Sequence, residues 1–250
     1  MPAASSAADL AQIQAYLFDL DGVLTPTVEV HTRAWAQLLS PVFAANGVEP
    51  YSERDYFAYI DGKPRFDGVR DALASRSISL PYGELTDPPE TQTVCGLGNR
   101  KNDEFRAVLD RDGVQPYPGS ARFLARALQL GKRVAVVSSS RNAPVVLAAA
   151  GLAEYFEVVI DGEVAAAHGL PGKPAPDTYL AAAETLGIAA ERCAVVEDAE
   201  SGVAAGRAGG FGLVIGIDRG VGAEQLRRFG ADIVVPDLDV LVASLDDEMN

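Results

Sequence analysis

Three features of the sequence predict an α/β fold, in which a doubly wound, Rossmann-like parallel sheet forms the core and an all-helical domain is inserted into it. Short β-rich runs alternate with helical stretches from residue 117 onward, a pattern typical of successive strand–helix–strand units. One further strand is expected at residues 16–18. No strand pattern appears between residues 27 and 112. We therefore expect a discontinuous core domain, residues 1–26 and 114–250, and a helical insertion, residues 27–113.

The first strand runs into a turn that carries two acidic residues. Leu17 and Phe18 are apolar strand residues, and Gly22 supplies the backbone freedom needed just beyond the strand end. Asp19 and Asp21 are two residues apart, so on a regular strand both carboxylates would point to the same face. Open α/β sheets bind ligands at this edge, and two neighbouring anions favour a cation between them or a proton on one. An ordinary Asp-Gly turn is the alternative interpretation.

Helical periodicity accounts for most of the insertion. Pro41 is expected to interrupt the first helix, and Asn46-Gly47 to end the apolar stretch that resumes after it. Residues 77–93 are rich in Pro, Gly, Thr and Asp and are expected to form a loop. The expected helices cover residues 28–39, 51–60, 65–76 and 98–109.

Helices and strands alternate in the remainder of the chain. The expected helices cover residues 121–130, 145–150, 177–186, 201–208 and 223–229. The expected strands cover residues 133–137, 158–160, 194–196, 213–215 and 233–235. These strands are short and almost wholly apolar, which is typical of a parallel sheet covered on both faces.

Composition excludes several classes of partner. The net charge of −14 argues against nucleic acid and against an anionic membrane surface. Cys95 and Cys193 provide neither a disulfide framework nor a zinc spacing, and they are expected to be buried. No run of 18 apolar residues occurs, and residues 2–8 lack the basic start and apolar centre of a signal peptide. We expect a cytoplasmic enzyme.

Polar residues follow the expected strand at residues 133–137. Ser138, Ser140, Arg141 and Asn142 come directly after it, before a helix. A serine hydroxyl with successive backbone N–H groups at a helix start can hold a phosphate group. A helix N-cap is the alternative role for such a serine.

Two later segments add charged residues to the candidate site. Lys173 stands between a glycine and a proline, in a loop stiffened by two prolines. Glu197 and Asp198 end a later strand and, with Asp19 and Asp21, form a set of hard oxygen ligands suited to Mg²⁺. The alternative for Lys173 is an ordinary surface lysine, and the alternative for Asp198 is a helix N-cap.

The order of these motifs resembles the haloacid dehalogenase superfamily: a DxDG turn, a serine after another strand, a lysine in GKPxPD and a later Glu-Asp pair. Dehalogenases of that superfamily lack the second aspartate, so Asp21 indicates phosphoryl transfer. Nearly the whole chain is similar to the β-phosphoglucomutase family, in which the helical insertion is a cap domain. The cap residues that carry this closer resemblance are His31, Trp35, Gly62, Arg65, Lys101 and Asn102.

The resemblance implies roles for the core residues. Asp19 would be the nucleophile that forms an aspartyl phosphate, and Asp21 the general acid/base. Mg²⁺ is the implied cofactor, held by Asp19, the carbonyl of Asp21 and Asp198, with Glu197 nearby.

It also implies a second phosphate site in the cap. Arg65 would hold that phosphate, helped by Ser140 and Asn142. His31 and Lys101 would help to position the acid/base. Ser138 and Lys173 would bind the transferring group, and the other residues implied around the substrate are Gly22, Trp35, Gly62, Asn102 and Arg141.

The function implied is a phosphomutase that interconverts β-glucose 1-phosphate and glucose 6-phosphate, with a small sugar phosphate as partner and a monomer expected. A sugar-phosphate phosphatase is the alternative. A catalytically silent binding module is disfavoured, because silent relatives should lack Asp19 or Lys173. Pro26, Asp61 and Arg141 depart from the family's pattern, and these departures bear on cap motion and on the preferred sugar.

Overall fold

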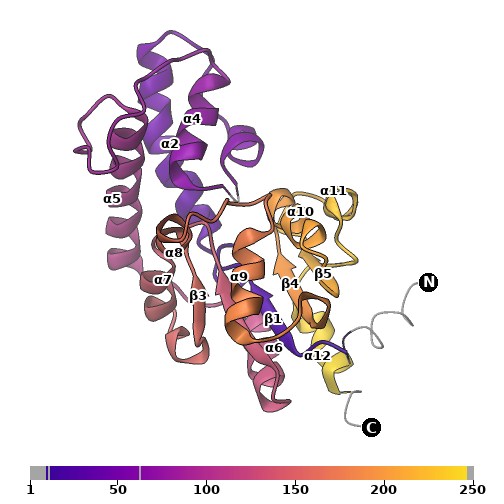
Figure 1. Cartoon of the computed structure of the whole chain (residues 1–250). Coiled ribbons are helices and arrows are strands. Elements are labelled where there is room, and N and C mark those ends of the chain that lie inside the picture. Colours follow the sequence, from indigo (N-terminus) through magenta and orange to yellow (C-terminus); the bar gives the residue numbers. More distant parts are fainter. Residues whose placement is uncertain (1–9, 11, 62, 247–250) are drawn as a thin grey trace. The chain divides into compact units, whose positions relative to one another are not determined.

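The structure, a computed structural model, describes residues 10, 12–61 and 63–246 (Figure 1). It divides into two compact units, Met1–Pro26 with Gln115–Asn250 and Thr27–Val114, which we call the core unit and the cap unit. Within the described residues, no helix is both long and apolar enough to cross a membrane.

The core unit is built on one parallel sheet. In the described part of the chain its strand order is β3-β2-β1-β4-β5-β6, and every neighbouring pair is parallel. This confirms the predicted α/β class, and β1 lies where the strand order reverses, the point at which such sheets bind ligands. The strands are β1 (Ala15–Phe18), β2 (Arg133–Val137), β3 (Val158–Ile160), β4 (Cys193–Glu197), β5 (Leu213–Ile217) and β6 (Ile233–Val235).

Helices cover the sheet. They are α6 (Pro118–Gln129), α7 (Ala143–Ala149), α8 (Gly162–Ala167), α9 (Asp177–Leu186), α10 (Glu200–Ala208), α11 (Ala223–Phe229) and α12 (Asp239–Asp246), with short 3₁₀ turns η2 (Ala153–Tyr155) and η3 (Ala190–Arg192). Helices α8 and α12 were not predicted. Asp161 starts α8, because its carboxylate accepts hydrogen bonds from the backbone N–H groups of Glu163 and Val164.

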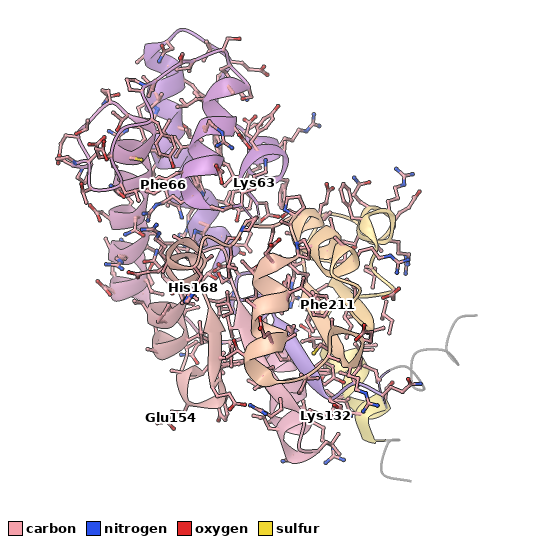
Figure 2. All side chains as sticks on the ribbon, in the orientation of Figure 1. Lys63, Phe66, Lys132, Glu154, His168 and Phe211 are labelled. Atoms are coloured by element: carbon pink, nitrogen blue, oxygen red, sulfur yellow. The ribbon has the colours of Figure 1, made fainter. Side chains whose placement is uncertain are left out.

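The two faces of β1 are packed differently. Leu17 belongs to a buried cluster with Tyr179 of α9 and with Phe211, and the rings of Tyr179 and Phe211 lie 6.0 Å apart. Phe211 is labelled in Figure 2. Phe18 points to the opposite face, where its ring meets that of Phe123 of α6 edge-on at 6.2 Å. Burial on both faces explains why this strand is apolar at each position.

The cap unit is helical throughout its described residues. Its elements are α2 (Val28–Ala45), α3 (Glu53–Asp55), the π-helical η1 (Tyr56–Ile60), α4 (Arg65–Ala74) and α5 (Val94–Asp112). The predicted interruption at Pro41 is wrong, because α2 runs through it. Proline removes one backbone hydrogen bond, but Leu38, Leu39 and Phe43 on either side are fully buried in the cap core, which keeps the helix continuous.

Helix α5 begins earlier than predicted, at Val94. Thr93 caps it, since its hydroxyl accepts a hydrogen bond of 3.0 Å from the N–H of Gly96. Residues 77–93 contain no helix or strand, as predicted.

Candidate active site

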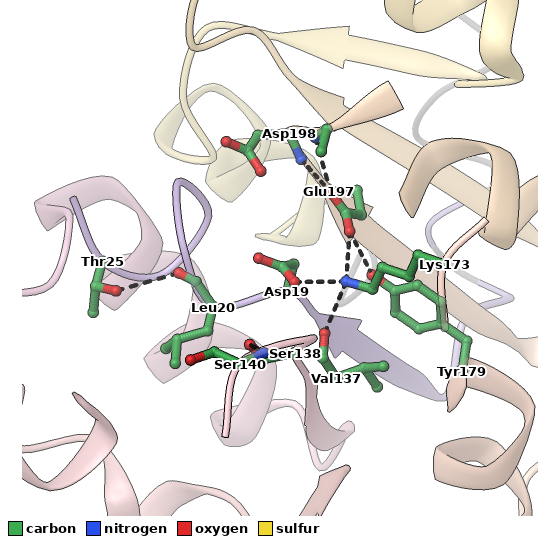
Figure 3. Close-up of polar contacts among 11 residues, drawn as sticks. Asp19, Leu20, Thr25, Val137, Ser138, Ser140, Lys173, Tyr179, Glu197 and Asp198 are labelled. Carbon is green, nitrogen blue, oxygen red and sulfur yellow. Dashed lines mark hydrogen bonds and ion pairs between the residues drawn. The ribbon is translucent and has the colours of Figure 1, made fainter. Parts of the chain in front are cut away.

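A buried lysine joins the ends of three neighbouring strands in the core unit (Figure 3). The ammonium of Lys173 donates to Asp19 Oδ1 at 2.6 Å, to Glu197 Oε1 at 2.6 Å and to the carbonyl of Val137 at 3.0 Å. A lysine ammonium has three donors, so each of them has an acceptor here.

Strand register brings these acceptors to one level of the sheet. In β1 and β4, Phe18 pairs with Val196, and Asp19 and Glu197 are the next residues along each strand. The N–H of Asp19 donates to the carbonyl of Val196 at 2.9 Å, which extends the ladder by one bond. Since side chains alternate along a strand, Asp19 faces the same side as Leu17, the side covered by α9.

Glu197 holds Lys173 and has no acceptor site left over. Its Oε1 accepts from Lys173 and, at 3.1 Å, from the hydroxyl of Tyr179. Its Oε2 accepts from the next two backbone N–H groups, both at 2.9 Å. A Cβ atom on Gly202 would lie 1.7 Å from Oε1, so glycine makes room for this carboxylate. These bonds occupy the four lone-pair sites of the carboxylate, so Glu197 is better placed to orient Lys173 than to bind a metal.

The charges in this cluster do not cancel. Burial alone would lower the pKa of Lys173, but the carboxylates of Asp19 and Glu197 outweigh it and hold that pKa well above its ordinary value. The lysine therefore stays charged at neutral pH. Asp21 adds further negative charge beside Asp19. Burial, with Glu197 and Asp21, raises the pKa of Asp19 well above its ordinary value despite Lys173, so the excess negative charge there favours a proton or a bound cation.

The carboxylate of Asp198 is seated against the acidic turn. Gly22 has a φ of +84°, and a Cβ atom there would lie 1.8 Å from Asp198 Oδ2, so only glycine allows this approach. Thr25 closes the turn, because its carbonyl accepts from the N–H of Gly22 at 2.8 Å. Asp19 and Asp198 could hold Mg²⁺ together with a backbone carbonyl.

Such a donor set fits magnesium, which is usually bound by one or two carboxylates and keeps several waters. No group of three or more His, Cys, Asp or Glu side chains that could hold a metal occurs within the described residues. Two carboxylates with a carbonyl fall below that number.

Two serine hydroxyl groups in the loop after β2 accept hydrogen bonds from backbone N–H groups of the same loop. Ser138 Oγ accepts from the N–H of Ser140, and Ser140 Oγ accepts from the N–H of Asn142, both at 3.1 Å. Ser138 directly follows Val137, whose carbonyl binds Lys173, so this loop lies beside Lys173 and the carboxylates that it contacts. Arg141 is half-buried and packs against Gly162 at the start of α8.

The cap unit brings together three other residues of the predicted site. Lys101, 4% exposed, contacts His31 Nδ1 and lies 5.4 Å from the ring centre of Trp35. Phe105 completes the group: the ring of His31 stacks on it at 4.1 Å, and the Lys101 ammonium lies 4.8 Å from its centre. Phe105 was not predicted, although its position four residues after Lys101 on α5 places both on one helix face.

Arg65 lies elsewhere in the cap unit, at the start of α4. Its Nη2 donates to Asn99 Oδ1 at 3.2 Å, and its guanidinium carbon lies 4.8 Å from the centre of the Phe66 ring. Asn102 follows Lys101 on α5 and is half-buried. Gly62 lies outside the described residues.

The chain is similar to proteins of known family in sequence and in structure. Residues 13–210 match the family model of haloacid dehalogenase-like hydrolases. The β-phosphoglucomutase of Mycobacterium tuberculosis is 48% identical over 242 residues, which cover 92% of each protein. The fructose-1-phosphate phosphatase YqaB of Escherichia coli is 32% identical over 198 residues, covering 79% of this chain and 93% of YqaB. The crystal structure of CbbY from Rhodobacter sphaeroides with phosphate superposes with a TM-score of 0.71 at 26% identity, covering 94% of this chain and 99% of CbbY.

Proposed function

The chain belongs to the haloacid dehalogenase-like hydrolase family, and on that premise we propose that it is a Mg²⁺-dependent phosphomutase. It would interconvert β-D-glucose 1-phosphate and glucose 6-phosphate through an aspartyl phosphate and a bisphosphate intermediate. The observation that carries the proposal is the buried contact of Lys173 with Asp19 and Glu197, because it fixes a carboxylate and a cation at one point.

Asp19 is the nucleophile in this scheme. One of its oxygens attacks one phosphorus of the sugar bisphosphate, so an oxygen–phosphorus bond to Asp19 forms while the bond from that phosphorus to the sugar oxygen breaks and a sugar monophosphate is released. Asp21 gives its proton to the departing oxygen. In the opposite step Asp21 takes the proton of the free hydroxyl of a sugar monophosphate as that oxygen attacks the phosphoryl group on Asp19, so the bond from phosphorus to Asp19 breaks and the bisphosphate forms. The bisphosphate then reorients, and its other phosphate returns to Asp19.

The remaining core residues hold the transferring group. Lys173 and Ser138 bind its oxygens. Mg²⁺, held by Asp19, the carbonyl of Asp21 and Asp198, would offset the negative charge that develops on the phosphoryl oxygens. Glu197 orients Lys173.

A mutase must bind two phosphates, because its intermediate is a bisphosphate. We assign the second phosphate to Arg65, whose guanidinium can bind two phosphate oxygens at once, with Ser140 and Asn142. His31 and Lys101 position the acid/base. Around the sugar we place Gly22, Trp35, Gly62, Asn102 and Arg141.

A sugar-phosphate phosphatase is the second candidate, in which water accepts the phosphoryl group from Asp19. The 32% identity to a fructose-1-phosphate phosphatase supports this second candidate.

Product analysis separates the two candidates. The purified chain is supplied with Mg²⁺, β-glucose 1-phosphate and a trace of glucose 1,6-bisphosphate, and glucose 6-phosphate and free phosphate are measured together. The mutase predicts glucose 6-phosphate with little free phosphate. Free phosphate without glucose 6-phosphate would make the protein a phosphatase.

A further inference from the structure

One amide in the cap unit ties three segments together. Asn99 of α5 accepts from Arg65 Nη2 at 3.2 Å through its Oδ1, while its Nδ2 donates to the carbonyls of Leu85 at 3.0 Å and Asp87 at 2.9 Å. Both N–H donors of the amide are thus used. Rotating the amide by half a turn would set its oxygen against two carbonyl oxygens, so the orientation that presents Oδ1 to Arg65 is fixed.

The loop that supplies these carbonyls is itself anchored to α5. Asp87 Oδ2 accepts from the hydroxyl of Thr93 at 2.6 Å, and that hydroxyl accepts from the N–H of Gly96 at 3.0 Å. The N–H of Cys95 donates to the carbonyl of Tyr82 at 3.0 Å. The amide of Asn99 is therefore held by a loop with its own fixed conformation.

The other side of Arg65 is also restricted. Its guanidinium carbon lies 4.8 Å from the ring centre of Phe66, the neighbouring residue on α4. A Cβ atom on Gly98 would come within 2.6 Å of that ring and 3.4 Å of Arg65 Cγ, so glycine allows α4 to approach α5 closely. Arg65 is half-buried, and its guanidinium meets a ring and an amide whose positions are fixed by the surrounding fold.

We propose that Asn99 is a positioning residue, which orients the Arg65 guanidinium toward the second phosphate of a sugar bisphosphate. This inference rests on the proposed function, because it concerns the residue assigned there to that phosphate. A guanidinium binds phosphate through a planar fork, so its orientation decides whether two hydrogen bonds form or one. Asn99 touches no reacting atom in this scheme and acts through Arg65.

A double-mutant cycle tests the link between the two residues. Asn99→Ala should raise the KM for β-glucose 1-phosphate about tenfold, the scale of one hydrogen bond to a charged group. It should leave the hydrolysis of acetyl phosphate, which has a single phosphate, within about twofold of the starting value. In an Arg65→Ala background, Asn99→Ala should change the KM by less than about twofold, because its effect passes through the missing side chain.

Binding provides a second measurement that does not depend on turnover. Glucose 1,6-bisphosphate is titrated by calorimetry into Asp19→Asn protein, with and without Asn99→Ala, and the affinity should fall about tenfold. Asn46→Ala is the matched control. The side-chain amide of Asn46 also donates a hydrogen bond of 2.9 Å to a backbone carbonyl in the cap unit, but that carbonyl belongs to Val42 and not to the segments that hold Arg65. Circular dichroism checks that each variant is folded.

The outcomes separate this inference from the function on which it rests. If Asn99→Ala has the same effect with and without Arg65, Asn99 acts independently and the inference is wrong. If it weakens bisphosphate binding no more than Asn46→Ala does, the inference is wrong as well. If the starting protein produces no glucose 6-phosphate, or if Arg65→Ala leaves isomerisation intact, the proposed function fails instead. Should Asn99→Ala not fold, Asn99→Ser takes its place in the cycle, with the same expectations.

Discussion

Lys173 and Glu197 form an ion pair of 2.6 Å in which both side chains are 1% exposed. Because both side chains are shielded from solvent, water cannot solvate either charge if the other is removed. The pair stands at the ends of β2 and β4, and its lysine also binds Asp19. Folding of the sheet and assembly of the candidate site are therefore coupled.

Glu197→Gln should weaken both folding and activity. Breaking a buried ion pair by removing one partner typically costs about 3–5 kcal/mol, and Lys173 would lose the partner that orients it. Chemical denaturation and phosphoryl-transfer assays measure the two effects. The control is Glu224→Gln, which removes the exposed pair of Glu224 with Arg228 and should cost less than about 1 kcal/mol. Equal effects of the two variants would contradict the prediction.

Asp19→Asn should abolish phosphoryl transfer while the protein stays folded. An amide is not a nucleophile comparable to a carboxylate, so no aspartyl phosphate can form. Rates with β-glucose 1-phosphate and with acetyl phosphate are to be measured alongside the circular dichroism spectrum. Retained turnover of either compound would exclude Asp19 as the nucleophile.

Gly22→Ala should lower Mg²⁺ affinity and activity together. The added Cβ atom would lie 1.8 Å from Asp198 Oδ2, so the carboxylate must move away from the turn. Gly47→Ala is a matched control, since Gly47 also has a positive φ but a Cβ atom there would meet nothing within 4 Å. Both should lose about 1–2 kcal/mol of stability through backbone strain. Only Gly22→Ala should weaken Mg²⁺ binding in calorimetry, and unchanged binding would count against Asp198 as a ligand.

Asp55 should make the cap unit sensitive to acid. Burial alone would raise the pKa of Asp55, but hydrogen bonds from Arg76 and Ser52 outweigh it and hold that pKa below its ordinary value of 3.8. A depressed pKa in the folded state means that this stabilisation is present above pH 3.8 and is lost as the pH falls through the lower, folded-state pKa. The stability difference between the starting protein and Asp55→Asn should therefore shrink on acidification. Thermal unfolding as a function of pH measures it.

The exposed Asp110→Asn is the control for that series, because Asp110 lies on the solvent side of α5. Its stability difference from the starting protein should stay near zero at each pH. A difference for Asp55→Asn that does not change with pH would contradict the assignment.

The sequence predicted the central strand and its acidic turn because their signals are local. Leu17 and Phe18 are apolar on both faces of the sheet, and Asp19, Asp21 and Gly22 follow at once. Helix α8 had a local signal too, the cap formed by Asp161, but a helix of 6 residues is too short to show a periodic pattern.

Contacts that depend on tertiary packing could not be predicted in this way. Tyr179 reaches Glu197 across 18 residues, and Arg65 reaches Asn99 across 34. Whether these side chains meet depends on how α9 packs on the sheet and how α4 packs on α5. Glycine at position 98 is an ordinary helix-weakening residue in the sequence, and its role becomes visible only when the Phe66 ring lies against it.

The most direct test of the account follows a labelled phosphoryl group. The protein is mixed with Mg²⁺ and radiolabelled glucose 1,6-bisphosphate, quenched in acid and digested, and the labelled peptide is sequenced. We expect label on Asp19, which then passes to glucose 6-phosphate when unlabelled β-glucose 1-phosphate is added. Label that appears only in free phosphate, or on a residue other than Asp19, would contradict it.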